Sequence, residues 1–257
     1  MHWKSTMKPV LYAGLISLLG SPPFAATLTK AQKQSVAGEV ETRADDLATI
    51  SKTIWDYAEV GYREVRSSEL LQQELAKAGF TVKSGIADIP TAFVASYKNG
   101  SGPVIAILAE YDALPGLAQT TAPAQTPIPG QAAGHGCGHN VFAAASVTAA
   151  IAVKAWMVQN GIKGELRLYG TPAEEGGSGK VYMVRAGLFD DVSAALHWHA
   201  SDHTGVKAGK TQANISGRFR FSGLSAHASA AADRGRSALD GVEVMNVAGN
   251  YLREEVA

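Results

Sequence analysis

The chain contains a single cysteine, Cys137, among its 257 residues. An internal disulfide is therefore impossible, and the fold does not depend on an oxidising compartment. Positive charge is not in excess either, because 23 Lys and Arg balance 23 Asp and Glu. A nucleic-acid partner is not expected, since nucleic-acid-binding domains carry a basic patch. The Gly-x4-Gly-Lys-Ser/Thr order of a phosphate-binding loop is also missing.

The first 26 residues have the order of a secretory signal peptide. Lys4 and Lys8 precede an apolar stretch over residues 10–20, a Ser-Pro-Pro break follows, and Ala25 and Ala26 are small residues suited to cleavage. The apolar stretch is too short to span a bilayer comfortably, so no stable membrane insertion is expected. We predict export to the periplasm or to the outside of the cell. The alternative is an apolar N-terminal helix of the mature fold.

Helix-like and strand-like segments follow one another along the remaining chain. The apolar run over residues 103–109 is typical of a strand covered on both faces, and the longer run over 141–157 is typical of a buried helix. We predict an α/β fold with a mostly parallel sheet. Helices are expected over residues 28–60, 69–78, 141–157, 180–187 and 236–255, and strands over 80–82, 92–97, 103–109, 165–169, 192–196 and 213–221.

The heptapeptide Gly-His-Gly-Cys-Gly-His-Asn, residues 134–140, gathers the cysteine, two histidines and three glycines. Cys137 and His139 are residue types that bind zinc and similar ions. The glycines allow sharp turns, so side chains two residues apart can converge. His135 and Asn140 are supporting candidates. The alternative is a flexible glycine loop with a chance cysteine.

Ionisable residues also follow three of the predicted strands. Glu110 and Asp112 come after residue 109, where a spacing of two places them on one side of an extended backbone. Carboxylates also follow the strand at 165–169, and imidazoles follow the strand at 192–196; these residues are Glu174, Glu175, His197 and His199. Open α/β sheets place their chemistry at the carboxyl ends of strands. We therefore predict a metal site in which one carboxylate binds the ion and its neighbour transfers protons.

With these motifs in order, the chain resembles the co-catalytic-metal aminoacylase/carboxypeptidase family, and within it the amidohydrolase branch. The residues that carry the resemblance, which spans residues 50–257, are the motifs at 110–114, 134–140 and 174–180, Trp198-His199, and Ala226-His227-Ala228. The resemblance implies two divalent ions, zinc or manganese. Their ligands would be Cys137, His139, Glu175 and a strand-end histidine, placed at His199 with His197 as the alternative.

The resemblance also implies catalytic roles. Glu174 would be the general base that takes a proton from the attacking water and passes it to the leaving amine. Asp112 would support a metal ligand, and His227 would polarise the substrate carbonyl from a lid domain. Glu110 stands where many relatives have a metal-binding histidine, which leaves its direct role open.

The same resemblance implies the substrate and the domain order. The substrate would be a small-molecule amide, an N-acyl or N-aroyl amino acid such as p-aminobenzoyl-glutamate. Residues 27–210 would be the N-terminal part of an incomplete catalytic domain, and residues 211–257 the beginning of an α+β lid domain that forms a homodimer. The family has a further strand and ligand histidine after the lid, so the 257-residue chain by itself is expected to have little or no activity.

Two other functions fit parts of the sequence. A thiol hydrolase would use Cys137 as nucleophile and His139 or His135 as base, which leaves the paired glutamates without a role. A non-catalytic binder of peptides or amino-acid conjugates would keep the fold and tolerate the loss of Glu174.

Overall fold

The chain divides into two compact units, Met1–Asp202 and His203–Ala257. The computed structural model describes residues 28–206, 209 and 216–252. The predicted signal peptide, residues 1–26, lies outside the described residues. Each unit is therefore considered by itself.

The predicted helix over residues 28–60 is wrong as a single element, because it is two helices: α1, Lys30–Glu41, and α2, Ala44–Tyr57. Thr29 starts α1 with a capping box to Gln32. At the break the Thr42 hydroxyl donates to the Glu39 carbonyl at 2.8 Å. No side chain of α1 is buried, whereas α2 buries Ile50 and Ile54. The break separates a surface helix from one that packs into the core.

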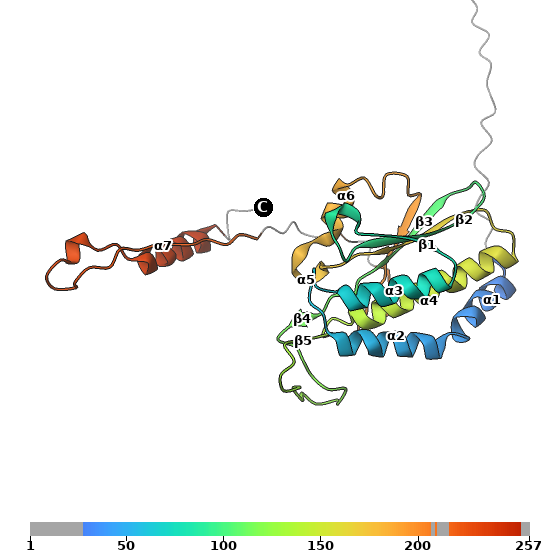
Figure 1. Ribbon diagram of the computed structural model, residues 1–257, viewed down its shortest axis with the longest axis horizontal. Coiled ribbons are helices and arrows are strands. Elements are labelled where there is room, and N and C mark those ends of the chain that lie inside the picture. The colour runs from blue at the N-terminus through green and yellow to red at the C-terminus, as the bar shows by residue number, and fades with distance from the viewer. Residues whose placement is uncertain (1–27, 207–208, 210–215, 253–257) are drawn as a thin grey trace, which may run out of the picture. The chain divides into compact units, whose positions relative to one another are not determined.

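Helices cover both faces of the sheet in the first unit, as Figure 1 shows. On one face lie α3, Val65–Lys77, and α4, His139–Gln159, with α2 packed on both. Their apolar side chains and those of the strands form the larger core, which includes Ile54, Leu71, Phe93, Val147 and Leu168. The opposite face carries α6, Gly179–Arg185, and a 3-10 turn, Ile86–Asp88. A smaller core around Met183 and Tyr169 fills that side.

The five-stranded sheet has the order β1-β2-β6-β3-β7. Its strands are β1, Thr81–Ser84; β2, Phe93–Asn99; β3, Val104–Ala109; β6, Gly164–Gly170; and β7, Ala194–Leu196. Pairs β6–β3 and β3–β7 are parallel, but β1–β2 and β2–β6 are antiparallel. The prediction of a mostly parallel sheet is therefore corrected to a mixed sheet. The reason is the position of β6 between β2 and β3. Since β6 runs parallel to β3 and antiparallel to β2, the consecutive strands β2 and β3 run in opposite directions without pairing.

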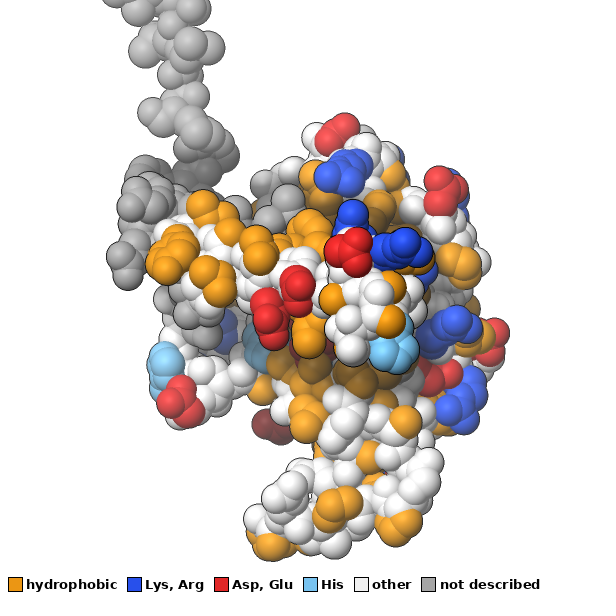
Figure 2. Space-filling view, turned by 90° about the vertical axis from the view of Figure 1, so that its left-hand side faces the viewer, with side chains coloured by type: hydrophobic (Ala, Val, Ile, Leu, Met, Phe, Trp, Pro, Cys, Tyr) orange, Lys and Arg blue, Asp and Glu red, His pale blue; other side chains and the backbone are white. Residues whose placement is uncertain are grey.

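Two short strands, β4, Leu114–Pro115, and β5, Ala133–Gly134, enclose the loop between them. Within this loop the Thr120 N–H donates to the Thr126 carbonyl at 2.9 Å, which closes a small hairpin. Residues 116–132 include no charged side chain. Figure 2 shows this loop at the bottom as a lobe of hydrophobic and uncharged side chains.

Helix α4 is, within the described part of the chain, the one helix that is long and apolar enough to cross a membrane. More than half of its most apolar stretch is buried inside the protein. Small residues such as Ala143, Ala144 and Ala150 let it pack against α2 and the sheet. Its burial matches the prediction of a core helix.

The second unit contains α7, Ala238–Tyr251, and a 3-10 turn, Ala232–Arg234. Ser237 caps α7 by accepting the Asp240 N–H at 3.1 Å. The predicted strand over residues 213–221 is not found where the structure describes it, from 216 onward. Residues 216–221 pair with no other described residue, and the nearest pairing is a single bridge between Leu224 and Arg236. A strand needs such a partner for its backbone hydrogen bonds.

Candidate metal centre

The site lies where the parallel half of the sheet ends. The residues that follow β3, β6 and β7, and those that start α4, meet at one edge because parallel strands end on the same side. The residues brought together are Glu110, Asp112, Cys137, His139, Glu174, Glu175, His197 and His199.

His139 is the fully buried centre of this cluster. Its Nδ1 lies 3.0 Å from the Asp112 carbonyl and 3.1 Å from Asp112 Oδ1, so Nδ1 carries a hydrogen and donates. Its Nε2 faces Glu110 Oε2 at 3.0 Å and Glu174 Oε2 at 3.9 Å. An Nδ1–H held by an oxygen leaves the Nε2 lone pair for a metal ion.

Cys137 and His199 form a second contact, with Sγ 3.3 Å from Nε2. His199 Nδ1 lies 2.9 Å from the Ala200 carbonyl and donates to it. Its Nε2 is therefore the ring atom turned toward the thiol and, like that of His139, can bind an ion. The ligand atoms of Cys137, His139 and His199 all lie within 4.8 Å of one another.

The paired glutamates differ in exposure. The Glu175 side chain is 18% exposed and that of Glu174 is 43% exposed. The Glu175 N–H donates to Asp112 Oδ2 at 2.8 Å, which ties this loop to the end of β3. Glu174 joins Glu110 and His139 in a second group of ligand atoms within 4.8 Å.

His197 lies apart from the thiol and contacts Glu110 instead, with Nε2 3.1 Å from Oε1. Lys180, at the start of α6, donates to the same carboxylate oxygen. Burial opposes the ionisation of Glu110, but His139, His197 and Lys180 hold the pKa of this carboxyl well below its usual range. Glu110 is therefore an anion in a buried position.

The carboxylates also change the pKa values of His139 and Cys137. Burial on its own would lower the pKa of His139, but Asp112 and Glu110 raise it to about 10. Burial and the carboxylates of Glu175, Glu174 and Glu110 raise the pKa of the Cys137 thiol to about 12. The site therefore has an excess of negative charge that favours bound cations over free ones.

A metal ion fits the residues present. Glu110 Oε2, His139 Nε2 and Glu175 Oε1 are buried without a hydrogen-bond partner within the described residues. The 3.0 Å contact between the first two lacks the alignment of a hydrogen bond. Buried polar atoms are rarely left unpaired without a reason. One sulfur, two imidazoles and several carboxylate oxygens are a ligand set suited to zinc or manganese.

Two other predicted residues of the first unit, His135 and Asn140, lie outside this cluster. His135 Nε2 lies 3.1 Å from the Ile54 carbonyl of α2, and the Asn140 amide donates to Ser51 Oγ at 3.0 Å. Both contacts therefore hold the segment 134–140 against α2. His227 belongs to the second unit, where its Nδ1 accepts the Ser229 and Ala230 N–H groups at 3.2 and 3.0 Å.

Sequence reasoning gave no role to Lys180, Glu64 or Tyr62. Lys180 was part of a recognised motif, and its charge could have been paired with Glu110 had the sheet order been known. Glu64 is fully buried, accepts the Ala173 N–H at 2.8 Å and accepts the Thr91 hydroxyl at 3.1 Å. The sequence around Glu64 is polar and contains no spacing that singles it out.

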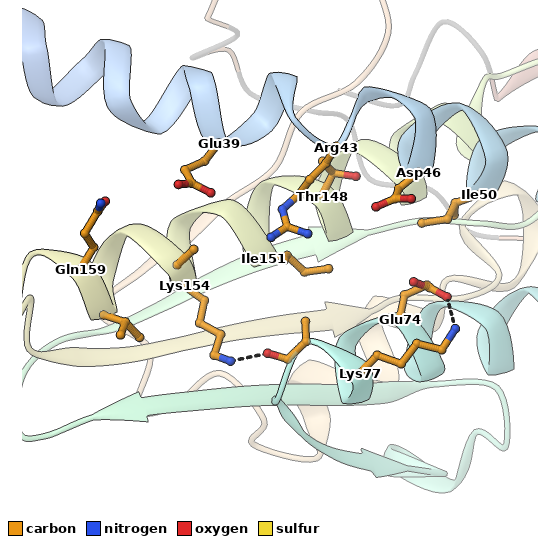
Figure 3. Close-up of a pocket in the computed structure, with 13 residues that line it drawn as sticks. Glu39, Arg43, Asp46, Ile50, Glu74, Lys77, Thr148, Ile151, Lys154 and Gln159 are labelled. Atoms are coloured by element: carbon orange, nitrogen blue, oxygen red, sulfur yellow. Dashed lines mark hydrogen bonds and ion pairs between the residues drawn. The ribbon is translucent and has the colours of Figure 1, made fainter.

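A separate cavity of about 630 Å³ lies among α1, α2, α3 and α4. Figure 3 shows its lining, which mixes acidic and basic side chains and includes no histidine or cysteine. Lys77 pairs with Glu74 at 2.7 Å, and Lys154 donates to the Ala78 carbonyl. None of its residues belongs to the candidate metal cluster, so the cavity is not where the predicted metal chemistry would take place.

Curated relatives match most of the chain. It is 48% identical over 219 residues to one of the subunits of p-aminobenzoyl-glutamate hydrolase from Escherichia coli, an alignment that covers 84% of this chain and 45% of the relative. It is 28% identical to mouse Xaa-Arg dipeptidase over 87% of this chain and 51% of the relative. The chain thus spans about half the length of the curated relatives it matches.

Solved structures agree on the fold. A dinuclear metal-binding peptidase of the M20 family from Bacillus subtilis has a TM-score of 0.50 and 27% identity, covering 64% of this chain and 44% of its own. An aminobenzoyl-glutamate utilization protein from Klebsiella pneumoniae has a TM-score of 0.51 and 18% identity, covering 65% of this chain and 46% of its own. The second likeness concerns the fold alone.

The sequence model of peptidase family M20/M25/M40 matches residues 106–251. This range contains every ligand candidate of the cluster, from Glu110 at the end of β3 to His199 after β7. The chain therefore belongs to the M20/M25/M40 peptidase family, a family of metal-dependent hydrolases.

Proposed function

We propose that this chain belongs to a metal-dependent amidohydrolase that cleaves the amide bond of an N-acyl or N-aroyl amino acid resembling p-aminobenzoyl-glutamate. One observation carries the proposal: the ligand atoms of Cys137, His139 and His199 converge within 4.8 Å, beside the second group formed by Glu110, His139 and Glu174. The substrate class is supported by the 48% identity to the Escherichia coli p-aminobenzoyl-glutamate hydrolase chain.

The residues that would hold two divalent ions are Cys137, His139, Glu175 and His199. We place the strand-end ligand at His199 because its Nε2 points to Cys137, whereas His197 Nε2 is engaged with Glu110. When bound, such ions polarise the amide carbonyl and lower the pKa of a water molecule toward neutrality.

Glu174 is the proposed general base. It is the more exposed carboxylate of the pair, and its Oε2 is 3.9 Å from His139 Nε2, beside the ligand atoms. A base there can take a proton from the attacking water and deliver it to the departing nitrogen. Asp112 holds the His139 ring in the required tautomer through Nδ1.

His227 is proposed to act on the substrate carbonyl. Two backbone N–H groups donate to its Nδ1, which places the hydrogen on Nε2. An imidazole Nε2–H is a donor suited to an oxygen that gains negative charge during the reaction.

Replacement of the base tests this mechanism. In a protein that contains this chain, Glu174→Gln should lower kcat by about 10² to 10⁴, the usual contribution of a general base. Metal content measured by mass spectrometry should be unchanged, because the amide keeps the shape of the side chain. The assay follows release of p-aminobenzoate from p-aminobenzoyl-glutamate. Undiminished turnover would rule out Glu174 as the base.

A thiol hydrolase is the second candidate, because the Cys137–His199 contact is also the geometry of a thiol and its base. The base would then be His199 and not His139 or His135, the two histidines that the sequence suggested. Burial and the surrounding carboxylates oppose this mechanism, since they raise the pKa of the thiol. A chelator distinguishes the two: it should abolish turnover and added zinc or manganese should restore it. A thiol enzyme would survive chelation. A non-catalytic binder on the same fold would have no turnover to lose and would tolerate Glu174→Gln.

Location and assembly are further proposals. We propose that residues 1–26 direct export to the periplasm or outside, and that residues 211–257 belong to a lid through which two copies form a homodimer. Fusion of residues 1–26 to an export reporter tests the first, and light scattering of the purified chain tests the second. The low activity expected of the 257-residue chain by itself stays a prediction.

A further inference from the structure

The loop that joins α2 to α3, residues 58–64, lies against both carboxylate-bearing loops of the site. Its backbone binds the end of β3, since the Ala113 N–H donates to the Glu59 carbonyl at 2.8 Å and Val60 bridges to Ala113. Asp112, which orients His139, is the residue before Ala113. One edge of this loop therefore fixes the strand end that carries Asp112.

The other edge of the loop holds the segment that carries Glu174 and Glu175. Glu64 Oε1 accepts the Ala173 N–H at 2.8 Å, and the Tyr62 hydroxyl donates to the Gly177 carbonyl at 2.5 Å. A Cβ added to Gly61 would lie 3.0 Å from Ala173, so the two backbones approach closely.

The backbone conformation of Ala173 is unfavourable and requires stabilising contacts from other segments, such as the hydrogen bond to Glu64. Its φ and ψ are 57° and 44°, the left-handed region that residues with a Cβ rarely adopt. It is fully buried and immediately precedes Glu174. Residues kept in this region persist where the surrounding structure determines them, and such strain gathers at functional sites.

Glu64 itself is unusual as a fully buried carboxylate in contact with no cation among the described residues. Burial of such a group is costly, and a plain core position would be filled by an apolar side chain. Its oxygens accept hydrogen bonds from the Thr91 hydroxyl and the Ala173 N–H. Ala173 is followed directly by Glu174 and Glu175, which belong to the candidate metal cluster.

From these contacts we propose that Glu64 is a positioning residue, which holds the Ala173 backbone so that Glu174 and Glu175 reach the metal cluster. The inference rests on the proposed metal centre. Glu64 does not contact the proposed ligand atoms. It acts by fixing the backbone at Ala173, which sets the direction in which the side chains of Glu174 and Glu175 point.

Three variants of the 257-residue chain test this role by titration with Co²⁺, followed by the visible absorption of the bound ion. Glu64→Ala removes the acceptor and should weaken Co²⁺ binding by about tenfold or more, the usual effect of losing a group that orients a ligand. Glu64→Gln should bind nearly as wild type does, because its amide oxygen can still accept the Ala173 N–H while the Thr91 hydroxyl rotates.

Glu59→Ala is the matched control for simple destabilisation. Glu59 lies in the same loop and accepts from the Arg66 and Ser67 N–H groups at the start of α3, with no contact to Ala173. It should lower the melting temperature and leave Co²⁺ affinity and the absorption spectrum unchanged. In metal-free protein, Glu64→Ala alone should speed amide exchange over residues 171–179.

The outcomes separate this inference from the proposed function. Equal effects of Glu64→Ala and Glu59→Ala on Co²⁺ affinity would overturn the positioning role while the metal centre stands. A wild-type chain that binds no Co²⁺ would overturn the metal centre and the positioning role with it. If Glu64→Ala does not fold, Glu64→Asp, one methylene shorter, replaces it with the same expected direction.

Discussion

Each central histidine has its two ring nitrogens in different surroundings. In His139 and His199, Nδ1 donates to an oxygen of the chain and Nε2 is turned toward other ligand candidates. His197 differs, because its Nε2 contacts Glu110. The chemistry that each imidazole can perform follows from which nitrogen is already engaged.

This difference predicts unequal effects of two neighbouring substitutions. His199→Ala should weaken binding of Zn²⁺ or Mn²⁺ by at least about tenfold, whereas His197→Ala should have a smaller effect. Isothermal titration of each variant with either ion measures the difference. The reverse order would identify His197 as the strand-end ligand.

The four-residue helix α5, Glu174–Gly177, is shaped by its two ends. Ala173 before it and Ser178 after it are both left-handed, with φ of 57° and 55°. A helix this short has little stability of its own, so its orientation depends on contacts with other elements. Tyr62 supplies one of them by packing on Gly177.

Two adjacent glycines of α5 provide a matched test of that packing. A Cβ at Gly177 would lie 2.4 Å from Tyr62 Cε2, while a Cβ at Gly176 would meet nothing within 4 Å. Gly177→Ala should therefore lower both metal affinity and the melting temperature, and Gly176→Ala should change neither. Differential scanning fluorimetry with and without metal measures both effects. If both variants behaved alike, the Tyr62 contact would not orient α5.

At the scale of the whole first unit, the cluster connects segments that are far apart in the sequence. Its members come from the ends of β3, β6 and β7 and the start of α4, between residues 110 and 199. A cation that binds these residues has affinity for the folded chain and not for the unfolded chain, because only the fold brings the residues together. Metal binding at the proposed centre would therefore be coupled to folding.

This coupling predicts that metal raises the stability of the chain. At a free metal concentration of 100 times Kd, the free energy of unfolding should increase by about 2.7 kcal/mol. Denaturant unfolding with and without a chelator measures the change. His139→Ala is the control, and it should abolish the difference. Equal unfolding curves of wild type with and without metal would contradict a centre built from these residues.

The sequence was sufficient to predict the parallel strands and the residues that follow them. Runs such as residues 104–109 are apolar on both faces, and the carboxyl ends of parallel strands share one edge, so Glu110, Glu175 and His199 were expected to converge. The antiparallel part was not predictable, because the insertion of β6 between β2 and β3 depends on packing across the whole sheet.

The break at Thr42 and the role of Glu64 were not predictable for a related reason. The apolar residues of 28–60 keep a helical period across the break, so this period does not reveal that α2 packs into the core while α1 stays on the surface. The proposed role of Glu64 depends on its hydrogen bond with Ala173, which is 109 residues away in the sequence. Such a contact has no counterpart in local spacing.

The Trp198 side chain offers a way to detect a metal ion bound at the site. Trp198 stands between His197 and His199, donates from Nε1 to Ser146 Oγ at 3.2 Å, and packs edge-on against Phe142 with ring centroids 5.3 Å apart. Its indole is thus a fluorophore fixed beside the proposed ligands. A paramagnetic ion such as Co²⁺ should quench its emission at short range, and Trp198→Phe should remove most of that quenching. The chain therefore contains its own optical reporter for metal occupancy.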